Sequence, residues 1–304
     1  MRILVTGGTG FIGSNLTIEL LKLGHDVLIT GHDAEQKIPN FHGKYLQPNF
    51  LGLDWGALGK IDALFHEAAL NDTTCLDERE MMLANVDSSL KLFEHAAKNG
   101  CRKIVYASST AVYGASPAPY IENKGLEPLN PYGRSKLILD EKAMEFAKVH
   151  PEITVVGLRY CNVYGPRENH KGKRASMIYQ LAKQMKNGNP KIFKNGEQKR
   201  DYIYVGDVVR ANLLALQSKE SGVFNCGFGG ATSFNDIIKL LNEVMGLDRV
   251  PEYIDNPYAD KYQNFTQCDM SLAKKVLGFV PKYNVKDGIK DYFASGFLTG
   301  SRPI

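Results

Sequence analysis

Near its start the chain reads Val5-Thr6-Gly7-Gly8-Thr9-Gly10-Phe11-Ile12-Gly13, between a short apolar run and a helix-like segment. In a strand-to-helix turn, the first glycine permits the tight turn and the second lets backbone approach a pyrophosphate. The third glycine allows the helix to pack closely on the strand. The helix N-terminus also presents unpaired N–H groups and a positive dipole end to phosphates. The stretch therefore predicts a dinucleotide site formed by Gly7, Gly10, Phe11, Ile12 and Gly13.

Outward from this turn, strand-like runs alternate with helix-like segments. The runs are residues 3–5, 27–29, 63–65, 103–107 and 154–158. Such alternation is typical of a parallel sheet that is covered by helices on both faces. The sequence therefore predicts an α/β fold with a doubly wound parallel sheet.

The first predicted helix carries an apolar stripe of Ile12, Leu16, Leu20 and Leu23, and Gly24 marks its end. This face is expected to pack on the sheet, so that the helix and its two flanking strands form a βαβ unit.

The second half of the chain is less regular. It holds a Gly-Asn-Pro turn at 188–190, a strand-like segment at 201–205 and helix-like segments near 234–246 and 271–277. We expect residues 1–166, joined by parts of 200–230, to form a cofactor-binding domain, and residues 167–304 to form mainly a substrate-binding lobe. No repeat or flexible linker suggests independent tethered modules.

The composition fits a globular protein with a sizeable core, since 43% of the 304 residues are apolar and 23% are charged. A net charge of +4 without a long basic run argues against nucleic acid as a partner. No apolar stretch reaches the roughly 18 residues of a membrane span, and no signal pattern opens the chain, so we expect a cytoplasmic protein without membrane contact. The five scattered cysteines predict neither a disulfide framework nor a metal site.

The end of the second predicted strand bears on the choice of dinucleotide. In this type of site an acidic residue roughly 20 residues past the glycines binds the adenosine ribose and would repel a 2′-phosphate. Gly31 stands at that place, and His32 and Lys37 lie near enough in sequence to meet a phosphate. Asp33 is also near enough to reach the ribose. We therefore predict NADP as the cofactor, with NAD as the alternative.

Tyr132 and Lys136 lie four residues apart, which places them on one helix face. A free tyrosine has a pKa of about 10 and is a poor base near neutrality. A neighbouring ammonium group favours the phenolate. Such pairs are common on protein surfaces, but Pro131 before this one and a hydroxyl-rich strand end upstream favour catalysis. Lys136 is also free to bind the ribose of a nicotinamide.

That strand end reads Tyr106-Ala107-Ser108-Ser109-Thr110-Ala111-Val112-Tyr113-Gly114. Open α/β sheets bind ligands at the C-terminal edge of their strands. A serine there is placed to hydrogen-bond a substrate hydroxyl as it becomes a carbonyl. The alternative role is simple capping of the strand end.

Together these segments resemble the extended short-chain dehydrogenase/reductase superfamily of nucleotide-sugar enzymes. The resemblance covers most of the chain and also includes His66-Glu67-Ala68-Ala69 and Arg159-Tyr160-Cys161-Asn162-Val163-Tyr164-Gly165-Pro166-Arg167. It implies a Rossmann-like fold and a triad of Ser109, Tyr132 and Lys136. Ser109 matches because it stands four residues before Tyr113. Cofactor contacts from Ala68 and Asn85 and a homo-oligomer are also implied.

Within the superfamily, three strings resemble ADP-glyceromanno-heptose 6-epimerases: residues 162–172, 199–202 and 262–267. Such enzymes bind NADP, oxidise the heptose at C6, let the ketone turn and return the hydride to its other face. The resemblance implies that Lys171 is the acid/base opposite Tyr132. It further implies a nucleotide-diphosphate sugar held by Thr73, Asn162, Lys171, Arg200 and Tyr262.

The basic stretch Arg167, His170, Lys171, Lys173 and Arg174 is either a solvated loop or a phosphate site. Next to Tyr-Gly-Pro we expect it to face the sugar diphosphate, because arginine and lysine suit phosphate oxygens.

Two departures from the heptose pattern leave alternatives. Gly31 replaces the ribose aspartate, and residues 70–72 lack the small side chains expected before the following threonines. A UDP-hexose 4-epimerase or another nucleotide-sugar oxidoreductase is the alternative enzyme. A 4,6-dehydratase is disfavoured because Thr110-Ala111 stands where its Asp-Glu pair is expected. A non-catalytic NADP-binding regulatory protein is disfavoured because all three triad residues are present.

Overall fold

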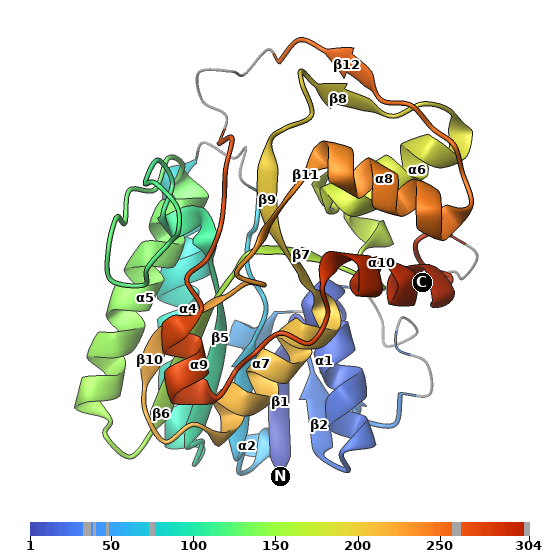
Figure 1. Cartoon of the computed structure of the whole chain (residues 1–304). Coiled ribbons are helices and arrows are strands. Elements are labelled where there is room, and N and C mark those ends of the chain that lie inside the picture. Colours follow the sequence, from blue (N-terminus) through green and yellow to red (C-terminus); the bar gives the residue numbers. More distant parts are fainter. Residues whose placement is uncertain (33–37, 39–40, 47–48, 73–76, 257–262, 301–304) are drawn as a thin grey trace.

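The computed structural model describes residues 1–32, 38, 41–46, 49–72, 77–256 and 263–300. Its centre is a seven-stranded parallel sheet with the order β10-β6-β5-β4-β1-β2-β3 (Figure 1). The strands are β1 (Arg2–Thr6), β2 (Asp26–Ile29), β3 (Lys44–Tyr45), β4 (Ala63–His66), β5 (Lys103–Ser109), β6 (Thr154–Tyr160) and β10 (Gly222–Cys226). All five predicted strand-like runs lie in this sheet, which confirms the α/β prediction.

Helices cover both faces of the sheet, and each face has its own apolar core. One core contains side chains of α1 (Phe11–Lys22), α7 (Val205–Gln217) and α9 (Ser271–Leu277), and the other contains side chains of α2 (Trp55–Leu58), α4 (Ser88–Lys98) and α5 (Pro131–Val149). Because side chains alternate along a strand, Ile3 and Val5 enter the first core while Leu4 enters the second. The sheet is therefore doubly wound.

The stripe on α1 is confirmed except at its end. Leu16 and Leu20 are fully buried, but Leu23 is 53% exposed, so its place in the stripe was wrong. The reason is that α1 ends at Lys22, and Leu23 lies beyond the last helical turn. Gly24 follows with φ 77°, a left-handed conformation that glycine adopts without strain.

The order of strands reverses at β1, which lies between β4 and β2. At such a point the connections leave the sheet toward opposite faces, and a crevice opens at the C-terminal ends of the strands. The glycine stretch follows β1 at this edge, and residues 67–70 follow β4. The fold thus brings these two segments to the same crevice.

A smaller lobe stands over this edge, opposite the N-terminus (Figure 1). It contains a three-stranded sheet in the order β11-β9-β7, a two-stranded sheet of β12 and β8, and helices that share a third apolar core. Its elements are β7 (Asn162–Tyr164), α6 (Met177–Asn187), β8 (Lys191–Phe193), β9 (Lys199–Tyr204), β11 (Ala231–Ser233), α8 (Phe234–Met245), β12 (Glu252–Ile254) and α10 (Val285–Ala294). We expected residues 271–277 in the lobe, whereas α9 packs against β10 and α7.

The remaining helical segments are short. They are α3 (Glu78–Met82), a π-helical turn at Leu83–Asp87, and 3-10 turns at Phe50–Gly52, Thr110–Val112 and Asn169–Arg174. Within the described ranges, no helix combines the length and apolarity needed to cross a membrane.

Candidate active site

A cavity of about 870 Å³ lies at the crevice, between the large sheet and the lobe. The structure brings most of the predicted site residues to it, namely Gly7, Gly10, Phe11, Ile12, Gly13, His32, Ala68, Ser109, Tyr132, Lys136, Asn162, Lys171 and Arg200. Three predicted residues, Lys37, Thr73 and Tyr262, lie outside the described residues. The cavity therefore extends from the glycine turn to Tyr132 and Lys136.

The glycine turn leaves no room for a side chain at Gly7 or at Gly13. Gly7 has φ +67°, and a Cβ on it would lie 2.7 Å from the Ala68 nitrogen. A Cβ on Gly13 would lie 2.2 Å from the Gly7 oxygen. Gly10, Phe11 and Ile12 line the cavity, so the start of α1, where helix N–H groups favour phosphate, faces it. These residues fit a bound dinucleotide.

At the end of β2, Gly31 and His32 line the same cavity. The Gly31 carbonyl accepts a hydrogen bond from the Tyr45 hydroxyl at 2.7 Å. A Cβ on Gly31 would lie only 1.9 Å from the Thr9 Oγ1. The Thr9 side chain therefore occupies the space that an acidic residue at position 31 would need.

Tyr132 lies in the first turn of α5. Asn130 caps this helix by accepting the Gly133 N–H at 2.8 Å, and Pro131 is its first residue. Burial raises the pKa of the Tyr132 phenol, while a hydrogen bond with Ser109 acts in the opposite direction. The Ser109 Oγ also accepts the Ala111 N–H at 3.1 Å. The same serine therefore caps the strand end and faces the cavity.

Lys136 lies one turn further along α5 and is 2% exposed. Its Nζ donates to the Ala107 carbonyl at 2.7 Å and lies 6.0 Å from the centre of the Tyr132 ring. Burial lowers the pKa of Lys136 to about 8, although the carboxyl groups of Asp140 and Glu67 act to raise it. The Lys136 ammonium group therefore lies beside the Tyr132 ring, on the same wall of the cavity.

A buried ion pair fixes α5 on the sheet beneath these residues. The Arg159 Nε on β6 donates to the Asp140 Oδ2 at 2.8 Å, and the Tyr106 hydroxyl on β5 donates to Asp140 at 3.0 Å. Both members of the pair are at most 4% exposed. The ion pair therefore holds the helix that carries Tyr132 and Lys136 in a fixed orientation.

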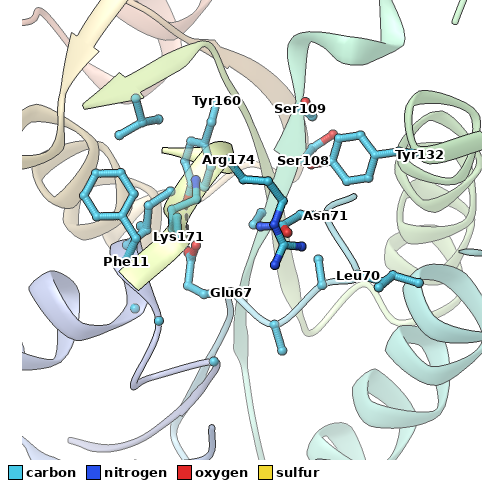
Figure 2. A pocket seen from close by; sticks show the side chains of 18 of the residues that line it. Phe11, Glu67, Leu70, Asn71, Ser108, Ser109, Tyr132, Tyr160, Lys171 and Arg174 are labelled. Carbon is cyan, nitrogen blue, oxygen red and sulfur yellow. Dashed lines mark hydrogen bonds between the residues drawn. The ribbon is translucent and has the colours of Figure 1, made fainter. Parts of the chain in front are cut away.

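The opposite wall of the cavity comes from the 3-10 turn Asn169–Arg174. Figure 2 shows Lys171 and Phe11 on one side of the pocket and Tyr132 and Ser109 on the other. The Lys171 Nζ lies 5.4 Å from the centre of the Phe11 ring. Burial lowers the pKa of Lys171, and the nearby Glu168 carboxyl acts to raise it. The cavity thus has a proton-carrying group on each side.

Glu168 holds this turn in place. It is fully buried, and its carboxyl group accepts the Ser176 N–H at 2.6 Å and the Gly165 N–H at 3.1 Å. Of the basic stretch, His170, Lys171 and Arg174 line the cavity, whereas Arg167 is buried and donates to the Ser14 Oγ at 2.8 Å. The stretch therefore faces the cavity through His170, Lys171 and Arg174.

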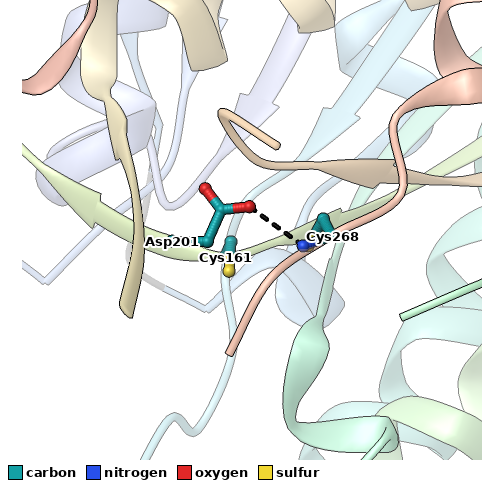
Figure 3. A group of neighbouring side chains, drawn as sticks. All are labelled: Cys161, Asp201 and Cys268. Carbon is teal, nitrogen blue, oxygen red and sulfur yellow. Dashed lines mark hydrogen bonds between the residues drawn. The ribbon is translucent and has the colours of Figure 1, made fainter. Parts of the chain in front are cut away.

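Asn162 and Arg200 reach the cavity from β7 and β9, which pair in parallel. The Asn162 Nδ2 donates to the Asp201 carbonyl at 2.9 Å. Figure 3 shows the Asp201 side chain beside Cys161 and Cys268. Its carboxylate accepts the N–H groups of Phe228 at 2.7 Å, Gly229 at 3.0 Å and Cys268 at 3.0 Å.

This arrangement makes Asp201 an anchor for two backbone segments, at Phe228–Gly229 and at Cys268. A hydrogen bond with Cys161, together with burial, raises the pKa of the Cys268 thiol. A protonated thiol is a poor metal ligand. The four described cysteines, Cys101, Cys161, Cys226 and Cys268, are all free and buried, as expected for residues that fill the core.

Asn85 lies behind the cavity wall. Its side chain accepts the Leu70 N–H at 2.8 Å and donates to the Leu70 carbonyl at 2.9 Å and to the Ser135 Oγ at 3.0 Å. Asn85 therefore fixes the loop after β4 to α5, a positioning role that sequence reasoning did not foresee.

Sequence reasoning also gave no role to Glu67 and Tyr160, which line the cavity. The Tyr160 hydroxyl donates to the Glu67 Oε1 at 2.8 Å. The available signal was position, since each residue stands at the C-terminal end of a strand in the sheet.

A comparison with family models matches residues 3–227 to the NAD dependent epimerase/dehydratase family. The chain belongs to this family. The match ends directly after β10, so it covers the whole large sheet. The expected nucleotide-sugar enzyme class is confirmed, and the non-catalytic alternative is not retained.

Among solved structures, this epimerase/dehydratase chain is similar to the ADP-L-glycero-D-manno-heptose-6-epimerase of Helicobacter pylori, with 37% identity and a TM-score of 0.87 over 97% of this chain and 95% of that one. It is similar to the UDP-glucose 4-epimerase of Thermotoga maritima, solved with UDP-glucose, with 30% identity and a TM-score of 0.86 over 97% and 99%. It is also similar to the UDP-glucuronic acid 4-epimerase of Bacillus cereus, solved with UDP-glucuronic acid and NAD, with 28% identity and a TM-score of 0.84 over 99% of each chain.

Proposed function

We propose that this enzyme inverts C6 of an ADP-linked heptose. The observation that carries the proposal is that Tyr132 and Lys171 line one cavity from different walls. One phenol cannot easily reach the oxygen of a transient ketone in both of its orientations, so a second proton donor is needed. The 37% identity with the Helicobacter pylori enzyme supports a heptose as the substrate.

Four residues of the chain act on the reacting hydroxyl group of the sugar. A dinucleotide held along the glycine turn would supply, through its nicotinamide, reversible hydride transfer at the carbinol carbon. Ser109 holds the reacting oxygen, and Tyr132 takes the hydroxyl proton with Lys136 favouring its phenolate. Lys171 donates a proton to the ketone oxygen when the hydride returns to the other face of the ketone.

The basic side chains of the lobe wall suit a diphosphate. Arg174 and Arg200 line the cavity with His170, and guanidinium groups match the geometry of phosphate oxygens. Asn162 contributes a sugar contact, and Thr73 and Tyr262 are proposed to complete the substrate site. In this assignment residues 1–166 with parts of 200–230 hold the cofactor, and residues 167–304 form mainly the substrate lobe of each subunit in a homo-oligomer.

We propose NADP as the resident cofactor. Gly31 leaves the end of β2 without the carboxylate that would repel a 2′-phosphate, and His32 lines the cavity there with Lys37 nearby in sequence. NAD is the alternative. Mass spectrometry of the nucleotide released by denaturing the purified protein is expected to detect NADP, and release of NAD alone would contradict this assignment.

The test of function is turnover of ADP-D-glycero-D-manno-heptose in deuterated water. NMR of the product is expected to show inversion at C6 without deuterium at that carbon, because the hydrogen returns as a hydride. Deuterium at C6 excludes the hydride route. Faster turnover of UDP-glucose than of the heptose supports the 4-epimerase alternative instead.

A further inference from the structure

Glu67 is the only carboxylic acid among the described residues that line the cavity. Four lysine and arginine side chains line the same space, namely Lys136, Lys171, Arg174 and Arg200. A single acid among several bases has a large effect on the local potential, because charges interact strongly where water is excluded.

Glu67 lies beside the glycine turn and within electrostatic reach of Lys136, the residue expected at the ribose of the nicotinamide. It follows β4 directly, at the reversal of strand order. A Cβ on Gly7 would lie 2.9 Å from the Glu67 carbonyl carbon, so the glycine turn and Glu67 are in contact. Figure 2 shows the Glu67 side chain on the side of the pocket that carries Lys171, below Lys171 in this view.

The groups that face Glu67 come from several elements. Tyr160 on β6 donates to it at 2.8 Å, and the Asn212 Nδ2 on α7 donates to the Tyr160 hydroxyl at 2.9 Å. Lys136 on α5 and the buried Cys226 thiol on β10 act on it through space. The neighbouring His66 is neutral at physiological pH, since burial lowers its pKa to about 3.

Burial raises the pKa of Glu67 to about 7, while the Tyr160 hydrogen bond and Lys136 act to lower it. Glu67 therefore changes its charge within the range of pH in which enzymes work. The catalytic scheme described above does not use this carboxyl group.

We propose that Glu67 is the electrostatic partner of the nicotinamide ring, and that as a carboxylate it selects the oxidised cofactor over the reduced one. The oxidised ring carries one more positive charge than the reduced ring, so an anion beside it favours the oxidised form. An epimerase begins and ends each cycle with oxidised cofactor, so this preference returns the enzyme to its competent state. The inference rests on the proposed reacting end at Ser109, Tyr132 and Lys136, and not on the identity of the sugar.

The test compares dissociation constants of the oxidised and reduced forms of NADP, and of NAD, for the full chain between pH 5.5 and 8.5. In the wild type, the preference for the oxidised form is expected to rise about tenfold as pH passes through 7, which corresponds to one pKa unit of coupling. Glu67→Gln is expected to abolish the part of this rise that is centred near pH 7, whereas a smaller rise near pH 8, where Lys136 loses its proton, remains. The proposal is overturned if Glu67→Gln keeps the wild-type preference for the oxidised cofactor. It is also overturned if the variant loses affinity equally for the oxidised and reduced forms.

Two further variants separate charge from structure. Tyr160→Phe removes the donor that favours the carboxylate, so the rise is expected to remain but to move to higher pH. Glu122→Gln is the control, because Glu122 is buried at 9% exposure but lies outside the cavity lining, where it accepts the Asn225 N–H at 2.9 Å. If circular dichroism shows that Glu67→Gln does not fold, an unshifted midpoint in Tyr160→Phe overturns the proposal. No sugar is present, so failure of the heptose assignment leaves these constants unchanged.

Discussion

The two walls of the cavity are built differently. Ser109, Tyr132 and Lys136 lie at the end of a strand and in the first turns of a long helix, which the Asp140–Arg159 pair fixes to the sheet. Lys171 lies in a 3-10 turn. Backbone with positive φ flanks it, at 75° in Arg167 and 57° in Gly172.

This difference separates the residues that transfer the proton, on regular elements, from the residues that select the sugar, on an irregular turn. Regular elements hold the triad at a spacing that the helix itself sets. The Lys171 wall depends on Glu168 and on a conformation that costs a non-glycine residue about 1 kcal/mol or more. Loops on a rigid scaffold often carry binding residues and vary more in sequence than the elements that they connect. We therefore expect the wall that carries Ser109, Tyr132 and Lys136 (the triad wall) to determine the reaction type. The wall that carries Lys171 is expected to determine which sugar is accepted.

The largest effect is expected on the triad wall. Tyr132→Phe keeps the ring but removes the proton carrier, so turnover is expected to fall by at least ~10²-fold while the cofactor remains bound. Steady-state kinetics and cofactor absorbance measure the two quantities. Tyr179→Phe, a half-buried tyrosine outside the cavity lining, is the control. Turnover near the wild-type rate removes Tyr132 from the mechanism.

The second prediction concerns the free energy of unfolding. Because burial lowers the pKa of Lys136 from 10.5 to about 8, the unfolded chain binds one more proton than the folded chain between these pH values. Stability therefore rises with pH across this range, and the buried ammonium group costs about 3 kcal/mol at pH 7. Lys136→Met is expected to be more stable than the wild type at pH 7, with turnover lost, and the stability difference is expected to vanish toward pH 10.5. Urea unfolding at pH 7 and pH 10 measures it; a variant that is less stable at pH 7 contradicts the prediction.

The smallest effect is expected on the irregular wall. Lys171→Met removes the proton donor for one ketone face, so we expect inversion to slow by about 10²-fold, the lower end of the range for lost acid/base catalysis, with a smaller change in KM. Lys173→Met is a matched control, because Lys173 is an exposed lysine of the same 3-10 turn and is not in the cavity lining. A change in KM alone would assign Lys171 to phosphate binding, and equal turnover of the two variants removes its acid/base role.

The same contrast explains what the sequence could predict. Helix and strand periods fix which residues share a face, so the five strands, the glycine turn and the Tyr132–Lys136 pair followed from local patterns. Leu23 was misplaced because the end of a helix depends on capping geometry rather than on its apolar stripe. Glu67, Tyr160 and Asn85 have no local signature, since their roles come from the strand order that brings distant segments together. The role of Lys171 was predicted only from the resemblance to heptose 6-epimerases. A basic loop has the same sequence pattern whether it binds phosphate or faces solvent.

The position of β10 has a consequence for synthesis of the chain. β6 needs β10 as its neighbour, but residues 161–221, with several elements of the lobe, are made between them. Until Gly222–Cys226 emerges from the ribosome, β6 is an open edge that carries Val155, Val156 and Leu158. Open apolar edges recruit other chains. A nascent chain that stalls within residues 161–221 is therefore expected to aggregate, because the β6 edge stays open until β10 pairs with it.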